Sequence, residues 1–197
     1  DDYKNMDIEG VSKEDIMDHL EQVPVRYFSH SGKEEVALHV DMIHRYGEND
    51  SESPTPIIHW RNDLRRSLTI VDIVTRDRNS LFEKLTGAFS VASLNILGAR
   101  AVTRKDGLAI DVFYVEDKNG GVVDDPKIRQ LCESSIRSFL ADKISPDELI
   151  SEKKKKTDRS QRFSNQDKLG ERIASQVDVY RDISLNRTIV ELSLIHI

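Results

Sequence analysis

The chain has few of the residues that build disulfides, metal-thiolate sites and membrane spans. Of its 197 residues only one, Cys132, is a cysteine. A single thiol excludes an intramolecular disulfide and a zinc site made of cysteines. No apolar run approaches the roughly 18–20 residues that a membrane-spanning helix needs. The composition therefore predicts a reducing, cytoplasmic setting and no membrane partner.

The chain also lacks an excess of basic residues. Lys and Arg number 29 against 35 Asp and Glu, which gives a formal net charge of −6. A dedicated nucleic-acid binder usually carries a basic footprint, so we expect no nucleic-acid partner. Residues 143–174 contain four consecutive lysines, but acidic residues flank them and apolar residues are scarce. This composition predicts a flexible charged linker.

Both ends of the sequence look atypical. The chain begins at Asp1 with neither an initiator methionine nor a signal peptide, so we expect it to come from the middle of a longer protein. Its last six residues, 192–197, read L-S-L-I-H-I. They resemble the translation of a transposon end used in sequencing libraries, and we interpret them as an adapter artefact. The alternative is a genuine strand.

Residues 1–60 carry two helix patterns. Ser12 and Asp15 have the spacing of a capping box, and a second apolar stripe predicts a helix over about 33–46. We interpret the region as a helical connector, the truncated end of a preceding domain. His39 and His44 lie five apart, which does not place both on one helix face for a shared metal, so we expect solvated histidines.

From residue 67 the pattern alternates between strands and helices. A β-branched run at 68–75 predicts a strand, and an apolar stripe from Leu81 to Ala92 predicts a helix. Asp106-Gly107 predicts a tight hairpin between two further strands. Asp125 and Pro126 are typical of a helix start. In that helix Cys132 falls on the apolar stripe, so we expect it to be a core residue.

The order β-α-β-β-α needs one more strand to complete a sheet. Residues 175–181 alternate and are assigned that role. The sequence thus predicts an α+β, ferredoxin-like βαββαβ domain over 67–142 with 175–181. A β-rich run at 187–191 is interpreted as the start of a second domain. This fold hosts many unrelated functions and decides none.

The residues after the first strand carry a family resemblance. Residues 77–88, D-R-N-S-L-F-E-K-L-T-G-A, resemble the D-R-x-G-L-F-x-K-x-x-G-A signature of ACT domains. With L-N-I-L-G-A-R at 94–100 and D-V-F-Y-V at 111–115, the run is similar to the first of two C-terminal ACT domains in bifunctional uridylyltransferase/uridylyl-removing enzymes acting on the signal protein PII. Residues 23–28 resemble the connector from that family's HD domain, and 188–191 the entry to its second ACT domain.

The resemblance implies a regulatory fragment whose partners are glutamine as effector, the HD domain, the second ACT domain and, for the parent enzyme, PII as substrate. The parent would use Mg²⁺ or Mn²⁺. The chain contains no Gly-Ser loop with paired aspartates and no His-Asp dipeptide. We therefore expect the fragment itself to hold no catalytic residue, metal ligand or cofactor, although its parent would be a nucleotidyltransferase and an HD-type hydrolase.

The resemblance also implies an effector site. Its residues are the loop Asp77, Arg78, Asn79, Ser80 and Leu81, closed by Asn95 and Ile96 at the start of a strand of a partner domain. A helix N-terminus offers unpaired amides and partial positive charge, which suit the carboxylate of a free amino acid. Asp77 could pair with the ammonium group.

Other roles for these residues stay open. Ser80 stands where ACT domains usually have glycine, which gives freedom to adopt positive φ. Asp77 could instead cap the helix, Asn95 could form a turn, and Arg78 could be a surface charge. The alternative function is a non-ligand-binding, ACT-like interaction module that scaffolds the enzyme. RNA binding is disfavoured because the strands lack paired sheet-face aromatics.

Overall fold

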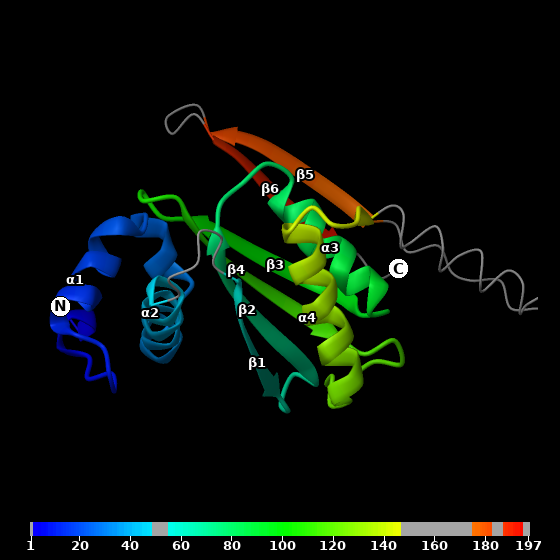
Figure 1. The fold of residues 1–197 in the computed structure, drawn as a ribbon, viewed down its shortest axis with the longest axis horizontal. Coiled ribbons are helices and arrows are strands. Elements are labelled where there is room, and N and C mark those ends of the chain that lie inside the picture. The colour runs from blue at the N-terminus through cyan, green and yellow to red at the C-terminus, as the bar shows by residue number, and fades with distance from the viewer. Residues whose placement is uncertain (1, 49–54, 147–174, 183–186, 195–197) are drawn as a thin grey trace, which may run out of the picture. The chain divides into compact units, whose positions relative to one another are not determined.

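The computed structural model describes residues 2–48, 55–146, 175–182 and 187–194 (Figure 1). The helical elements are η1 (Asp2–Asn5), α1 (Lys13–Gln22), η2 (Val25–Ser29), α2 (Lys33–Gly47), α3 (Leu81–Val91) and α4 (Pro126–Leu140). The strands are β1 (Ile57–Asp63), β2 (Leu68–Arg76), β3 (Asn95–Thr103), β4 (Leu108–Glu116), β5 (Ser175–Asp182) and β6 (Arg187–Leu194).

The fold is α+β, as the sequence predicts. Four strands form one antiparallel sheet in the order β1-β2-β4-β3, consistent with a ferredoxin-like ACT domain that follows a helical segment. The predicted helix starts are confirmed. Ser12 and Asp15 form a capping box at α1, and the Asp125 side chain caps α4 with Pro126 in its first turn. In α2 the N-cap is Gly32, without a side-chain hydrogen bond.

The fourth strand of the sheet comes from a different part of the chain than predicted. The assignment of residues 175–181 to it is wrong: β5 pairs antiparallel with β6 in a separate two-stranded sheet, with Ser175 opposite Leu194. The edge position beside β2 belongs to β1. A short turn joins β1 to β2, and Asp63 Oδ1 accepts hydrogen bonds from the amides of Arg65 and Arg66 there. A neighbouring strand with a short connection closes a small loop at little entropic cost.

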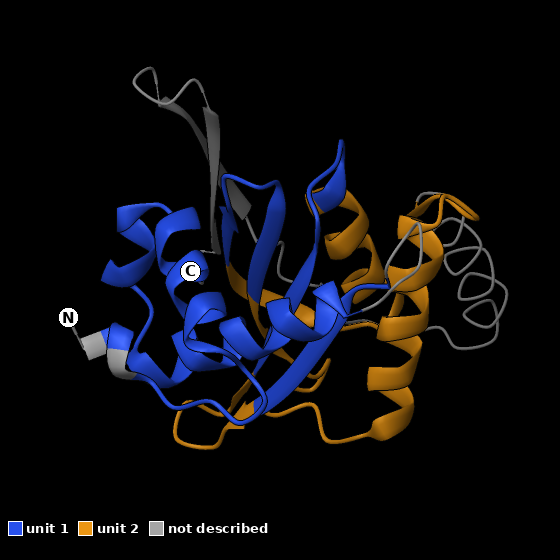
Figure 2. Ribbon diagram, turned by 60° about the vertical axis from the view of Figure 1, so that its left-hand side comes forward, with its two compact units in different colours: residues 1–61, 70–81, 100–112 blue, residues 62–69, 82–99, 113–197 orange. Residues whose placement is uncertain are grey.

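The chain divides into two compact units (Figure 2). The first comprises residues 1–61, 70–81 and 100–112. In its buried core, side chains of the N-terminal helical segment pack with strand residues Val74, Leu108 and Ile110. Helices α1 and α2 therefore share a core with β2 and β4 instead of forming one of their own. Their origin as the end of a preceding domain stays a prediction.

The second unit comprises residues 62–69, 82–99 and 113–197. Phe113 of β4 is fully buried, with its ring centroid 4.7 Å from that of Phe89 and 5.6 Å from that of Phe82. Cys132 is also fully buried, which confirms its place in the core, and burial raises the pKa of its thiol.

The remaining predictions concern the C-terminal part of the chain. Residues 147–174, most of the expected linker, lie outside the described residues, as do residues 195–197. The run 187–191 is a strand, part of β6, which extends through Leu194. A second ACT domain and an adapter at 192–197 stay predictions. Among the described residues, no helix has the length and apolar character needed to cross a membrane.

Candidate functional site

The predicted effector loop follows β2 and leads into α3. The Asp77 amide donates a 2.8 Å hydrogen bond to the Gly107 carbonyl, and Thr103 Oγ1 donates to Asp77 Oδ2 at 3.3 Å. The Leu81 amide donates to the Arg78 carbonyl at 3.2 Å. The loop is thus held to the β3–β4 hairpin at Asp77, and the Leu81 amide is already engaged.

The loop residues differ in exposure and conformation. Asp77, Asn79 and Ser80 are exposed, Arg78 is half-buried and Leu81 is buried. Ser80 has φ +56°, in the left-handed region that favours glycine. The backbone therefore adopts the conformation that the signature glycine would permit, although the residue is serine.

The two remaining predicted site residues lie at the start of β3. Asn95 is exposed and Ile96 is half-buried. They belong to the second unit, whereas Asp77–Leu81 belong to the first. The structure therefore groups five of the seven predicted residues within one unit, and the role of Asn95 and Ile96 stays a prediction.

Asp111 of β4 is a feature that our sequence reasoning missed. Its side chain is 3% exposed, and its Oδ2 has no hydrogen-bond partner among the described residues. Burial, together with repulsion by Asp77, raises the pKa of Asp111 to about 7. The signal was visible as the lone acid in the apolar run L-A-I-D-V-F at 108–113.

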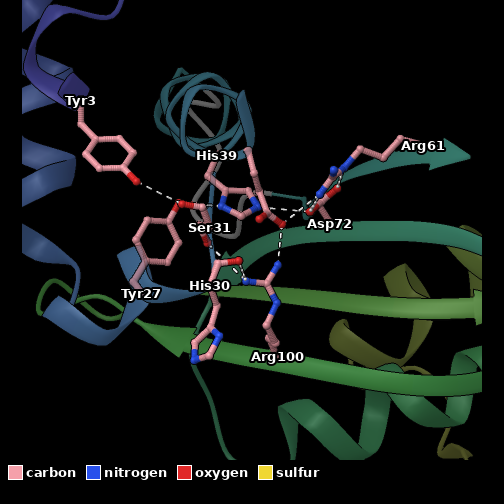
Figure 3. Close-up of polar contacts among 9 residues, drawn as sticks. Tyr3, Tyr27, His30, Ser31, His39, Arg61, Asp72 and Arg100 are labelled. Atoms are coloured by element: carbon pink, nitrogen blue, oxygen red, sulfur yellow. Dashed lines mark hydrogen bonds and ion pairs between the residues drawn. The ribbon is translucent and has the colours of Figure 1, made fainter. Parts of the chain in front are cut away.

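A buried polar network links α2 to the sheet (Figure 3). His39 is fully buried, so its prediction as a solvated histidine is wrong. It lies three residues after Val36, on the apolar face of the helix. Its Nε2 contacts Asp72 Oδ1 at 3.2 Å, and its Nδ1 contacts the Tyr27 hydroxyl at 2.7 Å. An ionised carboxylate only accepts, so Nε2 of His39 carries a proton and donates to Asp72.

Two arginines complete the network. Arg61 donates to Asp72 at 2.8 Å through Nε and to Glu35 at 2.9 Å through Nη2, and Arg100 donates to Glu35 at 2.6 Å. Two guanidinium groups therefore balance two carboxylates. Burial raises the pKa of Asp72, but hydrogen bonds from His39 and Arg61 outweigh it and hold that pKa below its usual range.

The same cluster has the spacing of a metal site. One potential ligand atom each from Glu35, His39 and Asp72 lies within 4.8 Å of the others. Both carboxylates, however, already accept hydrogen bonds from arginines, which a cation would have to displace. We therefore interpret the cluster as an ion network that fastens α2 to β1, β2 and β3.

A buried arginine attaches α1 to the β3–β4 hairpin. Arg104 is 3% exposed and donates to Asp18 at 2.7 Å and to Asp106 at 2.8 Å. Its Nη1 lies 3.2 Å from His19 Nδ1. Burial and the charge of Arg104 lower the pKa of His19 to about 3, so this histidine stays neutral and accepts. The Lys105 amide also donates to the Gln22 carbonyl at 3.1 Å.

No family model matches the chain, but curated relatives do. It is 41% identical to the bifunctional uridylyltransferase/uridylyl-removing enzyme of Azospirillum brasilense over 64 residues, 32% of this chain and 7% of that protein. The enzyme of the same name from Acinetobacter baumannii (strain ATCC 17978) is 24% identical over 169 residues, 85% of this chain and 18% of that protein. The enzyme of this name from Vibrio cholerae is 26% identical over 123 residues, which are 62% of this chain and 14% of that protein.

The chain thus spans less than a fifth of the length of these relatives. They confirm that homologues of the chain carry the name of the family it resembles. Its place within the C-terminal regulatory part stays a prediction.

The ion network generates a stability prediction. Asp72→Ala leaves Arg61 and His39 without their carboxylate, and we expect it to lower the free energy of unfolding by ~3–5 kcal/mol. Asp41→Ala removes an exposed pair with Arg45 and should cost less than about 0.5 kcal/mol. Urea unfolding followed by circular dichroism measures both. Equal, small losses for the two variants would contradict the proposed role of the network.

Asp111 generates a pH prediction. Its raised pKa means that the native state holds the proton more tightly than the unfolded chain, whose carboxyl titrates near 3.8. The contribution of Asp111 to the free energy of unfolding should therefore fall as pH rises from about 4 through about 7. Asp111→Asn cannot ionise, so we expect it to be more stable than wild type by ~2–4 kcal/mol near pH 8 and by less near pH 5. Urea unfolding at both pH values checks this; an advantage independent of pH would refute it.

The conformation of Ser80 generates a third prediction. Ser80→Gly relieves the left-handed backbone but gains entropy in the unfolded chain, so stability should change by less than ~1 kcal/mol. Ser80→Val places a β-branched side chain at positive φ and should cost ~1–3 kcal/mol. Thermal unfolding compares the two. If valine were tolerated as well as glycine, the loop would not hold this conformation in solution.

Proposed function

We propose that the chain is the ACT-like regulatory region of a bifunctional uridylyltransferase/uridylyl-removing enzyme that acts on PII, and that it senses glutamine. The observation that carries the proposal is the loop 77–81, whose signature residues enter α3 through a left-handed Ser80. The relatives of that name support it.

The loop offers complementary chemistry to a free amino acid. The amides of Asn79 and Ser80 precede the first turn of α3, where partial positive charge favours a carboxylate. Asp77 supplies an exposed carboxylate for the ammonium group, and the Thr103 hydroxyl holds one of its oxygens. Because Leu81 already donates to Arg78, we assign the ligand carboxylate to the amides of Asn79 and Ser80.

A bound effector would have a physical route to the helical segment. The Asp77 amide donates a hydrogen bond to the Gly107 carbonyl of the hairpin. Arg104 and Lys105 of the same hairpin donate hydrogen bonds to residues of α1. We propose that a shift at Asp77 is passed along these contacts. In the parent enzyme it would bias the preceding domains from uridylylation of PII towards removal, while Mg²⁺ or Mn²⁺ would serve their chemistry.

A second candidate is a module that scaffolds the enzyme without binding a ligand. Serine in place of the signature glycine and the engaged Leu81 amide favour it, because both reduce what the loop can offer. The two functions differ in whether a free amino acid binds the loop.

Calorimetric titration with L-glutamine separates them. We expect wild type to bind, and Asp77→Ala to lose a charge-assisted contact worth ~1.5–3 kcal/mol, a ~10–100-fold loss in affinity. Asp41→Ala is the matched control and should bind as wild type does. Since a partner domain could complete the site, the titration is repeated on a chain extended through a second ACT copy. Absence of binding at millimolar glutamine in both proteins would favour the scaffold.

A further inference from the structure

We infer that Asp111 and Thr75 form a buried polar site beside the effector loop and that this site binds the ammonium group of the effector. The inference rests on the proposed function and adds two ligand-binding residues, Thr75 and Asp111, to those that the family resemblance implies. It starts from two buried polar atoms that have no hydrogen-bond partner among the residues that the structure describes.

The two side chains point to the same face of neighbouring strands. Strands β2 and β4 are adjacent, and the Asp77–Gly107 hydrogen bond joins their ends. Val74 and Ile110 pack in the core with the N-terminal helices. Because successive strand residues point to opposite faces, Thr75 and Asp111 both point to the other face.

Within the described part of the chain, one polar atom of each side chain lacks a hydrogen-bond partner. Thr75 is fully buried and Asp111 is 3% exposed, and Thr75 Oγ1 and Asp111 Oδ2 have no hydrogen-bond partner among the described residues. Buried polar atoms in native structures are nearly always paired, because desolvation without a partner costs free energy. A group that supplies donors to both atoms would remove this cost.

The chemistry of the site selects a cation with several donors. A carboxylate only accepts hydrogen bonds, and a hydroxyl can also accept, which matches the N–H groups of a primary ammonium. The charge that acts on Asp111 is the carboxylate of Asp77, which adds to the attraction for a cation and opposes an anion. Asp77 lies at the surface and Asp111 is buried, so the two would contact the ammonium from opposite sides.

Binding would change the protonation of Asp111. Its pKa of about 7 means that a substantial fraction of the free protein carries a carboxylic acid at neutral pH. An ammonium group stabilises the ionised form, so that fraction loses its proton to the buffer as the ion pair forms. A glutamine-dependent proton release is therefore a direct signature of the site.

The experiment titrates the whole chain with two probes near pH 7, L-glutamine and 4-carbamoylbutanoate, which lacks only the amino group. For wild type we expect tighter binding of glutamine and proton release, measured in buffers of different ionisation enthalpy. For Asp111→Asn we expect a loss of about tenfold or more in glutamine affinity, less than about threefold in that of 4-carbamoylbutanoate, and no proton release. Asp41→Asn is the matched control, and Thr75→Val should weaken glutamine binding less than Asp111→Asn.

Failure of the inference is distinguishable from failure of the proposed function. If Asp111→Asn binds glutamine as wild type does, with the same proton release, the site holds a structural water at most and the inference is wrong while the sensor stands. If folded wild type binds no glutamine at millimolar concentration, even in the extended chain, the proposed function fails and the inference with it. Asp111→Asn and Thr75→Val are nearly isosteric with the residues that they replace, and unfolding curves check that each variant folds.

Discussion

Asp72 is the residue on which the arrangement of the first unit depends. It accepts hydrogen bonds from His39 of α2 and from Arg61 of β1, and Arg61 and Arg100 are in turn joined by Glu35. A buried charge is tolerated only when it is paired and hydrogen-bonded. In the observed position of α2 the two guanidinium groups balance the two carboxylates, so a shift of the helix would leave buried charge uncompensated.

Two features of the first unit depart from what stability alone favours. Ser80 adopts a left-handed backbone, and Asp111 buries a carboxyl oxygen that has no hydrogen-bond partner in the described part of the chain. Native proteins tend to break such local rules at functional sites and to compensate elsewhere. Here the compensation is the packed core that β2 and β4 share with α1 and α2, together with the two arginine networks. The loop can thus hold its left-handed conformation at a cost that the rest of the unit offsets.

The sequence predicted the structural features that are set by residues close together in the chain. The capping box at Ser12, the hairpin at Asp106-Gly107 and the start of α4 at Asp125 are local patterns, and the structure confirms them. It did not predict the partners of His39, since Asp72 and Tyr27 are brought to it only by tertiary packing. Strand β1 was missed because residues 57–60 were assigned to the helical connector and residues 61–63 to no element. In the candidate site the loop was identified through a family signature, whereas Asp111, a lone acid in an apolar run, carries no signature and was overlooked.

The central claim is that the loop 77–81 binds an amino acid and is physically linked to the helical segment. Hydrogen–deuterium exchange of the backbone amides, with and without saturating L-glutamine, tests it most directly. The account predicts slower exchange in the loop, in the hairpin around Arg104 and Gly107, and in α1, with the exposed β1–β2 turn unchanged. Identical exchange of all these segments in both samples would contradict it, and slower exchange confined to the loop would contradict the link through the hairpin.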